Sequence, residues 1–177
     1  MTKMNPLLAN NKRFASTYTP AALGVPARQL VIVTCLDHRV DPAIILGLQL
    51  GDAPVIRNAG GRVTQAVIDD VTFLAFLAGQ LFGQESTDTL FEVAIMHHTQ
   101  CGTAFLADPD FRRRTVEATG LLDPDLAAEA VVDPYETVRA DVARLRAAPS
   151  LPPRVGVSGH VYDIATGRVT ISRGVSA

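Results

Sequence analysis

The feature that most constrains this fold is a nearly unbroken apolar run, QLVIVT, at Gln29–Thr34. The run is rich in β-branched residues and lacks polar alternation, which is typical of a strand buried on both faces of a parallel sheet. Similar runs at Pro54–Arg57, Thr89–Met96 and Val155–Tyr162 predict three more strands. Because helical patterns fill the gaps between these runs, we expect an α/β domain with a mostly parallel sheet.

Spacing and capping residues predict the helices. Over Gln65–Leu81, apolar residues recur at three- and four-residue intervals, which predicts a helix with one buried stripe. The stripe consists of Val67, Val71, Leu74, Ala78 and Leu81. Asp-Pro pairs indicate helix starts, since Asp caps the helix and Pro fits its first position. The four pairs begin at Asp41, Asp108, Asp123 and Asp133, and the last opens a charged helix over Pro134–Ala148.

The C-terminal part predicts a hairpin. The segment Asp163–Gly167 has the length of a hairpin loop and leads to a fifth strand over Arg168–Ser172, which should lie antiparallel at an edge. The 177 residues, 47% hydrophobic and 19% charged, suit one globular domain over residues 1–177. Residues 1–25 are expected to form an N-terminal arm. A net charge of −2 argues against nucleic acid or a membrane as partner.

The chain is expected to be cytoplasmic. Lys12 and Arg13 interrupt any signal-peptide pattern, and the uncharged stretch Val71–Gln84 holds 14 residues, fewer than a membrane helix needs. Thiols stay reduced in the cytoplasm. We therefore expect Cys35 and Cys101 to be ligands, catalysts or core residues and not a disulfide pair.

Three polar clusters follow the first three predicted strands: Cys35–Arg39 (CLDHR), Arg57–Gly61 (RNAGG) and His97–Gly102 (HHTQCG). In open α/β sheets, ligands bind beyond the carboxyl ends of the strands, near a topological switch point. The three clusters therefore predict one site at this edge. Within it, Arg57 is expected either to line the site or to pair with a carboxylate in a dimer.

The site has the composition of a metal centre. His98 and Cys101, three residues apart, can reach one ion, and Cys35 completes a Cys₂His set of the kind that holds catalytic zinc with an open fourth position. Asp37 is a candidate fourth ligand, or Arg39 holds it in a bidentate pair beside a zinc-bound water. The alternatives are small buried cysteines and a simple Asp-Arg salt bridge.

These motifs, C-x-D-x-R followed by H-x-x-C-G, resemble those of the β-class carbonic anhydrases, in particular their shorter, plant-type-like members. The resemblance extends over nearly the whole chain. Residues 7–14 (LLANNKRF) are similar to the family's N-terminal helix, residues 51–60 (GDAPVIRNAG) to its second-strand motif, and Gly156–Gly167 to its end.

The resemblance implies zinc on Cys35, His98 and Cys101, with Asp37 as a possible fourth ligand in a closed state. It also implies a parallel sheet of order 2-1-3-4 with an antiparallel fifth strand. His97 is not a ligand in the family's spacing and is expected to point to the opposite face of its strand.

The implied activity is the reversible hydration of carbon dioxide to bicarbonate by zinc-bound hydroxide, the carbonate dehydratase (lyase) reaction. Asp37 and Arg39 would form the catalytic dyad. Backbone N–H groups around Gly60, Gly61 and Gly102 would help to bind the substrate.

Family members are dimers or multiples of dimers whose N-terminal helices lie across the partner, so we expect a homodimer or a dimer-based homo-oligomer. Phe73, Phe76 and Phe82 are interpreted as core or dimer contacts.

His38 stands where the family often has a small residue. We interpret it as a solvated or hydrogen-bonded loop histidine, with proton transfer as the alternative.

Two other functions remain open. Some proteins similar to β-carbonic anhydrases hydrolyse carbonyl sulfide or carbon disulfide, and HHTQCG and GLQLGDA resemble parts of that group. A non-catalytic zinc-binding subunit is the third hypothesis. The intact pair of Asp37 and Arg39 argues against it, because a purely structural site does not need the pair.

Overall fold

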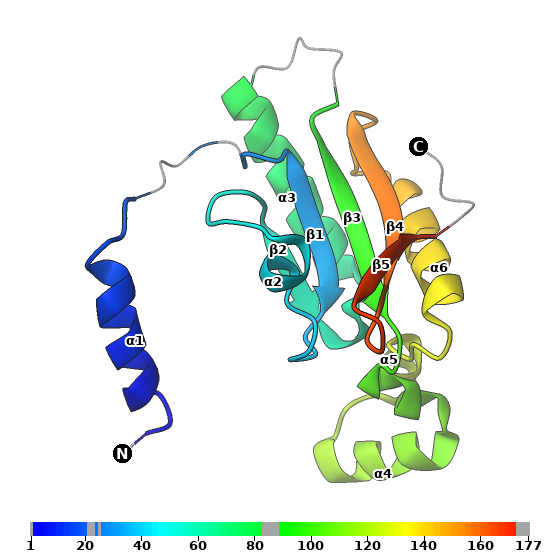
Figure 1. The fold of residues 1–177 in the computed structure, drawn as a ribbon. Coiled ribbons are helices and arrows are strands. Elements are labelled where there is room, and N and C mark those ends of the chain that lie inside the picture. Colours follow the sequence, from blue (N-terminus) through cyan, green and yellow to red (C-terminus); the bar gives the residue numbers. More distant parts are fainter. Residues whose placement is uncertain (1, 21–23, 25, 83–88, 173–177) are drawn as a thin grey trace.

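Five strands form one sheet, in the order β2-β1-β3-β4-β5 (Figure 1). The computed structural model describes residues 2–20, 24, 26–82 and 89–172, so parts of the expected arm at residues 1–25 lie outside it. The strands are β1 (Leu30–Cys35), β2 (Val55–Asn58), β3 (Phe91–His98), β4 (Val155–Asp163) and β5 (Arg168–Ile171). All five predicted strands are present, with ends displaced by one or two residues.

The pairing confirms the expected topology. β1 lies parallel to both β2 and β3, β3 lies parallel to β4, and β5 alone is antiparallel, at the edge beside β4. The hairpin closes through a hydrogen bond from Gly167 N to Asp163 O, with Gly167 at a φ of 71°. The central strand β1 is almost completely buried, as its unbroken apolar run predicted.

Asp-Pro pairs begin four of the helices. The helices are α1 (Asn5–Ala15), α2 (Pro42–Leu46), α3 (Gln65–Phe82), α4 (Pro109–Thr119), α5 (Asp123–Ala128) and α6 (Pro134–Arg146), with 3-10 turns η1 (Ala59–Gly61) and η2 (Gly102–Ala107). Asp41, Asp108 and Asp133 accept hydrogen bonds from backbone N–H groups at the starts of α2, α4 and α6. The helix start predicted at Asp123 is confirmed, but its role as the cap was wrong. Leu122 occupies the cap of α5, and the Asp123 carboxylate accepts a hydrogen bond from Arg112 Nε at 2.8 Å instead.

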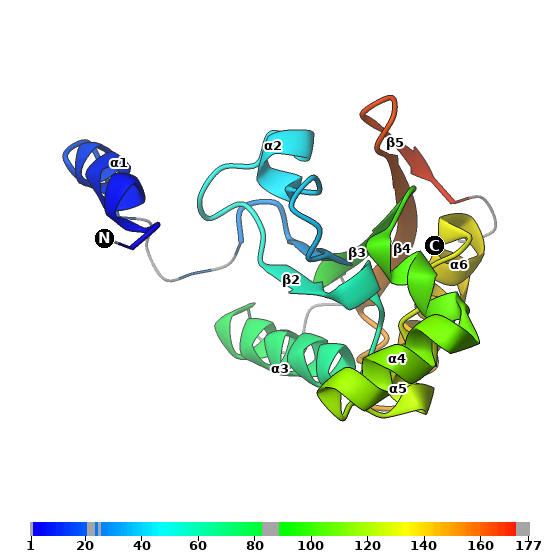
Figure 2. The ribbon, with the colours of Figure 1, turned by 90° about the horizontal axis from the view of Figure 1, so that it is seen from below.

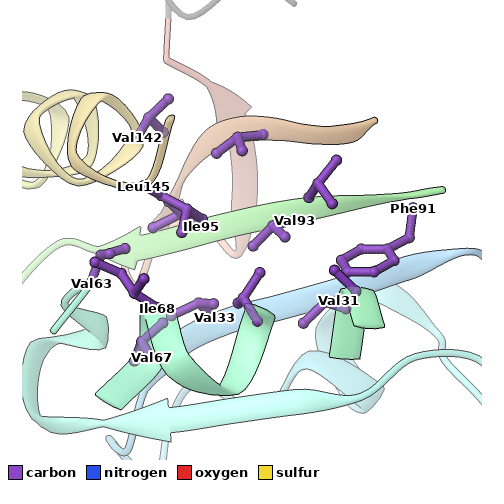
Figure 3. Packing of buried hydrophobic residues seen from close by; sticks show 14 of the residues in the cluster. Val31, Val33, Val63, Val67, Ile68, Phe91, Val93, Ile95, Val142 and Leu145 are labelled. Atoms are coloured by element: carbon purple, nitrogen blue, oxygen red, sulfur yellow. The ribbon is translucent and has the colours of Figure 1, made fainter. Parts of the chain in front are cut away.

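The main core lies between the sheet and the helices α3 and α6. Val33 and Ile95 from the strands meet Val67 and Val71 from α3, and Figure 3 shows Val142 and other α6 side chains closing the same cluster. Seen from below in Figure 2, α2 lies across the sheet from α3.

The predicted stripe of α3 is only partly correct. Val67 and Val71 are buried, and Leu74 and Ala78 pack against the core from its margin. Leu81 was predicted to be buried but is 54% exposed. It lines a pocket of about 140 Å³ between α3 and the start of β1.

Helix α1 stands apart from the sheet (Figure 1), and none of its residues is buried within the chain. On α3, Phe73 and Phe76 are exposed and therefore do not belong to the core of this chain, whereas the side chain of Phe82 lies outside the described part. Among the helices of the described residues, none combines the length and the apolar character that a membrane crossing requires.

The turn after β2 approaches β1 very closely. Gly61 has a φ of 70°, and a Cβ atom at this position would lie 2.8 Å from both Cys35 N and Thr34 C. Only a residue without a side chain fits here, because the neighbouring atoms belong to the backbone of a central strand. The turn and the end of β1 therefore hold each other in place.

Gly61→Ala should lower the free energy of unfolding by about 2–4 kcal/mol, because it adds left-handed strain to a backbone clash. Gly79→Ala is the matched control, since Gly79 lies in α3 with open space around its Cα. That variant should gain up to about 1 kcal/mol from helix propensity. Urea unfolding of the metal-free proteins measures both values, and equal effects of the two substitutions would contradict the close approach.

Candidate metal centre

Two neighbouring parallel strands bring three potential ligands together. Cys35 is the last residue of β1, His98 is the last residue of β3, and Cys101 follows three residues later. Their ligand atoms all lie within 4.8 Å of one another, and all three residues are buried. The two Sγ atoms are 3.9 Å apart, and both cysteines are free.

The hydrogen bonds of His98 prepare one ring nitrogen for a metal. Its Nδ1 lies 2.9 Å from Thr99 O, and because a carbonyl only accepts, Nδ1 must carry the proton. The Nε2 atom, which faces the sulfur atoms, is buried and has no hydrogen-bond partner among the described residues. A buried polar atom left unpaired is costly. A cation at this position would satisfy it.

The sulfur atoms lie among hydrogen-bond donors. Cys35 Sγ accepts a hydrogen bond from the backbone N–H group of Asp37, and Cys101 Sγ lies 3.1 Å from Thr103 Oγ1. The hydrogen bond from Cys35 lowers the pKa of the Cys101 thiol against the opposing effect of burial, whereas the same bond and burial raise the pKa of the Cys35 thiol. Without a metal, the pair therefore favours a thiolate at Cys101, the form in which cysteine binds metals. The Cys₂His donor set fits zinc.

A carboxylate held by a guanidinium group stands beside the cluster. Arg39 donates from Nε to Asp37 Oδ1 at 2.9 Å and from Nη2 to Asp37 Oδ2 at 2.6 Å. This pairing keeps the pKa of Asp37 well below its usual range. Asp37 Oδ2 lies 4.0 Å from His98 Nε2, so the carboxylate faces the cluster but is paired with Arg39. Arg39 Nη2 also donates to Gln100 O, which ties the pair to the loop before Cys101.

Arg57 has a structural role that the sequence did not reveal. Its guanidinium group donates to three backbone carbonyl oxygens of the loop after β1, at 3.0 Å to Cys35, 2.8 Å to Asp37 and 2.7 Å to Val40. It binds backbone in this chain and pairs with no carboxylate in the described part. Arg57 therefore fixes the loop that carries the Asp37 carboxylate.

A second buried histidine lies next to the cluster, on the face of the sheet that α6 covers. His97 Nε2 is 3.2 Å from Gly61 O and 3.2 Å from Asp141 Oδ2 on α6. Asp141 was not predicted as a residue of the site. The signal that could have found it is its position on the buried stripe of α6, beside Val138, Val142 and Leu145, where a lone carboxylate is unusual.

The remaining candidate residues lie around this cluster. Gly60 and Gly61 are buried in the turn after β2, while Gly102 is exposed at the start of η2. The side chain of His38 is 92% exposed, with Nδ1 3.7 Å from Asp37 Oδ1. A role of the three glycines in substrate binding stays a prediction.

Comparisons with known proteins agree with this geometry. The family model described as carbonic anhydrase matches residues 30–127. Beta-carbonic anhydrase 1 of Mycobacterium tuberculosis is 34% identical over 96% of this chain and 97% of that protein. The carbon disulfide hydrolase of Acidithiobacillus thiooxidans is 32% identical over 83% of this chain and 79% of that protein. A crystal structure of carbonic anhydrase from Streptococcus mutans superposes with a TM-score of 0.79, at 33% identity over 98% of this chain and 99% of that chain.

The cluster should bind one zinc ion per chain. Cys101→Ser should weaken zinc binding by more than about 100-fold, because it replaces a thiolate ligand with a poorly ionised hydroxyl group. Competition with a chromophoric chelator measures the affinity. His38→Gln, a change at an exposed side chain outside the cluster, is the control and should keep the affinity. Wild-type affinity in Cys101→Ser would remove this cysteine from the ligand set.

Proposed function

The chain belongs to the β-carbonic anhydrase family, and on this premise we propose that it catalyses the reversible hydration of carbon dioxide to bicarbonate at a zinc ion. Cys35, His98 and Cys101 would hold the ion. The observation that carries the proposal is the ionised carboxylate of Asp37, which Arg39 aims at the cluster from outside it. A site that only held a metal would not need this carboxylate.

Each ligand is suited to its part. The proton on His98 Nδ1 leaves the lone pair of Nε2 for the ion. The Cys101 thiol has a lowered pKa, and Cys35 would lose its proton when the ion binds. When bound, zinc acts as a Lewis acid that lowers the pKa of water to about 7 and so makes hydroxide available at neutral pH. The net reaction joins water to carbon dioxide and releases bicarbonate and a proton.

Asp37 and Arg39 would orient the attacking oxygen. Because its pKa is well below the usual range, the Asp37 carboxylate only accepts hydrogen bonds, and it can take the one from the attacking hydroxyl group. That bond directs an oxygen lone pair toward the carbon of carbon dioxide. The two N–H groups of Arg39 fix the plane of the carboxylate and hold it away from the ligand cluster.

Backbone N–H groups would bind the product, bicarbonate. We place bicarbonate near Gly60, Gly61 and Gly102, whose turns border the cluster. The backbone of Gly60 lowers the pKa of the Cys35 thiol, so its contribution would be to the ligand. The proton leaves to solvent, and the exposed ring of His38 beside Asp37 lies on the outer side of the site.

Carbon disulfide or carbonyl sulfide is the second candidate substrate. The observation that favours it is the 32% identity to a protein named carbon disulfide hydrolase. Both reactions start with attack of an oxygen nucleophile on a linear, electrophilic carbon, so the same zinc site and the same pair of Asp37 and Arg39 would serve either. The rates of both reactions, measured on the same protein, therefore identify the substrate.

The apolar side chains exposed on the N-terminal helix α1 and on α3 support a homodimer or a dimer-based homo-oligomer. Helix α1 exposes Leu7, Leu8 and Phe14 and buries none of its residues, and α3 exposes Phe73 and Phe76. A second copy of the chain would remove such apolar side chains from water.

Because the site requires reduced thiols, we also propose a cytoplasmic location.

Asp37→Ala should lower kcat/KM for carbon dioxide hydration by about 100-fold or more while zinc stays bound, because the carboxylate acts on the reacting oxygen. Stopped-flow measurement of proton release gives the rate, and metal analysis gives the zinc content. Asp52→Asn, at a buried carboxylate in the loop before β2, is the matched control and should keep the rate.

Parallel assays of hydrogen sulfide release from carbon disulfide and carbonyl sulfide separate the two candidate substrates. Fast hydration of carbon dioxide with slow release of hydrogen sulfide is the expected result. The reverse order in a zinc-loaded protein would transfer the assignment to the sulfur substrates.

Leu8→Glu together with Phe14→Glu should shift the chain toward the monomer, because charges on α1 oppose its burial against a second copy. Sedimentation velocity measures the change. Leu121→Glu, an exposed residue outside both helices, is the control. An unchanged dimer in the double variant would exclude α1 from the interface.

A further inference from the structure

A buried ion network lies directly behind the metal cluster, with Asp141 of α6 at its centre. The side chain of Asp141 is 2% exposed, and its carboxylate is surrounded by four N–H groups. Arg62 Nε and Nη2 lie at 2.7 and 3.1 Å, and Val63 N and His97 Nε2 each lie at 3.2 Å. A charge is retained in such a place only when its partners are well arranged.

These contacts join segments that are far apart in the sequence. Burial would raise the pKa of Asp141, but the hydrogen bonds from His97 and Arg62 hold it below its usual value, so the carboxylate is ionised. Arg62 also donates through Nη1 to Ala128 O and Ala130 O, at the end of α5. The network therefore connects α6 to the turn after β2 and to β3.

Two routes lead from the network to the ligands. The first runs through the turn: Gly61 O accepts the N–H of His97, and Gly61 packs on the backbone of Thr34 and of Cys35, the residue that carries one ligand sulfur atom. The second is covalent, since His97 directly precedes the ligand His98. Both sets of contacts connect Asp141 to a ligand residue, Cys35 in the first and His98 in the second. Neither requires Asp141 to touch the metal.

We propose that Asp141 is a positioning residue for the metal centre, which fixes the Gly60–Gly61 turn and His97 and through them the places of Cys35 Sγ and His98 Nε2. This inference rests on the proposed zinc site. It makes the helix α6, which contributes no ligand, part of the reason that the three ligand atoms meet. A merely structural Asp141 would stabilise the fold without any effect on the geometry of the bound metal.

Asp141→Asn tests the proposal in the full-length protein. An amide keeps the size of the carboxylate but places an N–H₂ group against the N–H donors of Arg62, Val63 or His97. We expect a zinc affinity about 10–100-fold lower, the range for partners that orient metal ligands. In the cobalt(II)-substituted protein, the thiolate-to-cobalt absorption bands should change in position or intensity.

Asp52→Asn is the matched control. Asp52 is also a buried carboxylate, which accepts a hydrogen bond from Gln49 N at 2.9 Å and lies 3.6 Å from Arg28 Nε. Neither of these partners belongs to the network around Asp141. This variant should keep the zinc affinity and the cobalt spectrum. Circular dichroism at the assay temperature checks that each variant is folded.

A second pair of variants keeps the test decisive if Asp141→Asn does not fold. His97→Gln can place an amide N–H where His97 Nε2 now donates, whereas His97→Phe fills the space without a donor. The glutamine variant should retain wild-type zinc affinity and cobalt spectrum, and the phenylalanine variant should lose affinity by about 10-fold or more. Wild-type affinity and spectrum in both Asp141→Asn and His97→Phe would overturn the positioning role.

The readouts separate this inference from the proposed activity. A wild-type protein that binds zinc, loses affinity in Asp141→Asn and does not hydrate carbon dioxide would contradict the substrate and support the positioning role. A protein that hydrates carbon dioxide, with unchanged zinc affinity and cobalt spectrum in Asp141→Asn and His97→Phe, would give the opposite result. Absence of zinc binding in the wild type would overturn both.

Discussion

The parallel pairing of β1 with β3 is the constraint on which the rest of the site depends. Parallel neighbours end at the same edge of a sheet, so Cys35 and His98, which are far apart in the chain, meet where both strands stop. Cys101 then needs only a short loop to reach them. A buried sheet with helices on its face makes this register rigid, because a one-residue slip would turn apolar side chains away from the core.

Charge compensation is the second requirement. Sulfur atoms, two carboxylates and two imidazole rings lie at one end of a mainly apolar core, and each needs donors or cations nearby. Arg39 supplies them to Asp37, and Arg57 holds the carbonyl groups of the loop beneath it. On the helix-covered side, Arg62 does the same for Asp141. Three arginines, each with a different partner, thus support one cluster.

The strands, their mostly parallel arrangement and most element boundaries could be predicted from local patterns of apolar, Asp-Pro and Gly residues, whereas the spatial order of the strands was an implication of the family resemblance. Two details of the helices differ from the prediction. The Asp123 carboxylate binds Arg112 and does not cap α5, and Leu81 is exposed beside a pocket. Neither the guanidinium group nor the pocket is visible from the residues that surround these positions in the chain.

The sequence by itself determined the strands, most helix starts and the ligand-type residues at the strand ends, since these follow from local composition and spacing. Only the tertiary structure decided which partners those residues have. Asp37 pairs with Arg39 instead of joining the ligand cluster, Arg57 binds backbone carbonyl groups, and Asp141 meets His97 and Arg62. The physical reason is that the partner of a side chain depends on which groups the folded chain brings within hydrogen-bond distance. For Asp141 this is set by how α6 packs on the sheet, and no local pattern encodes that packing.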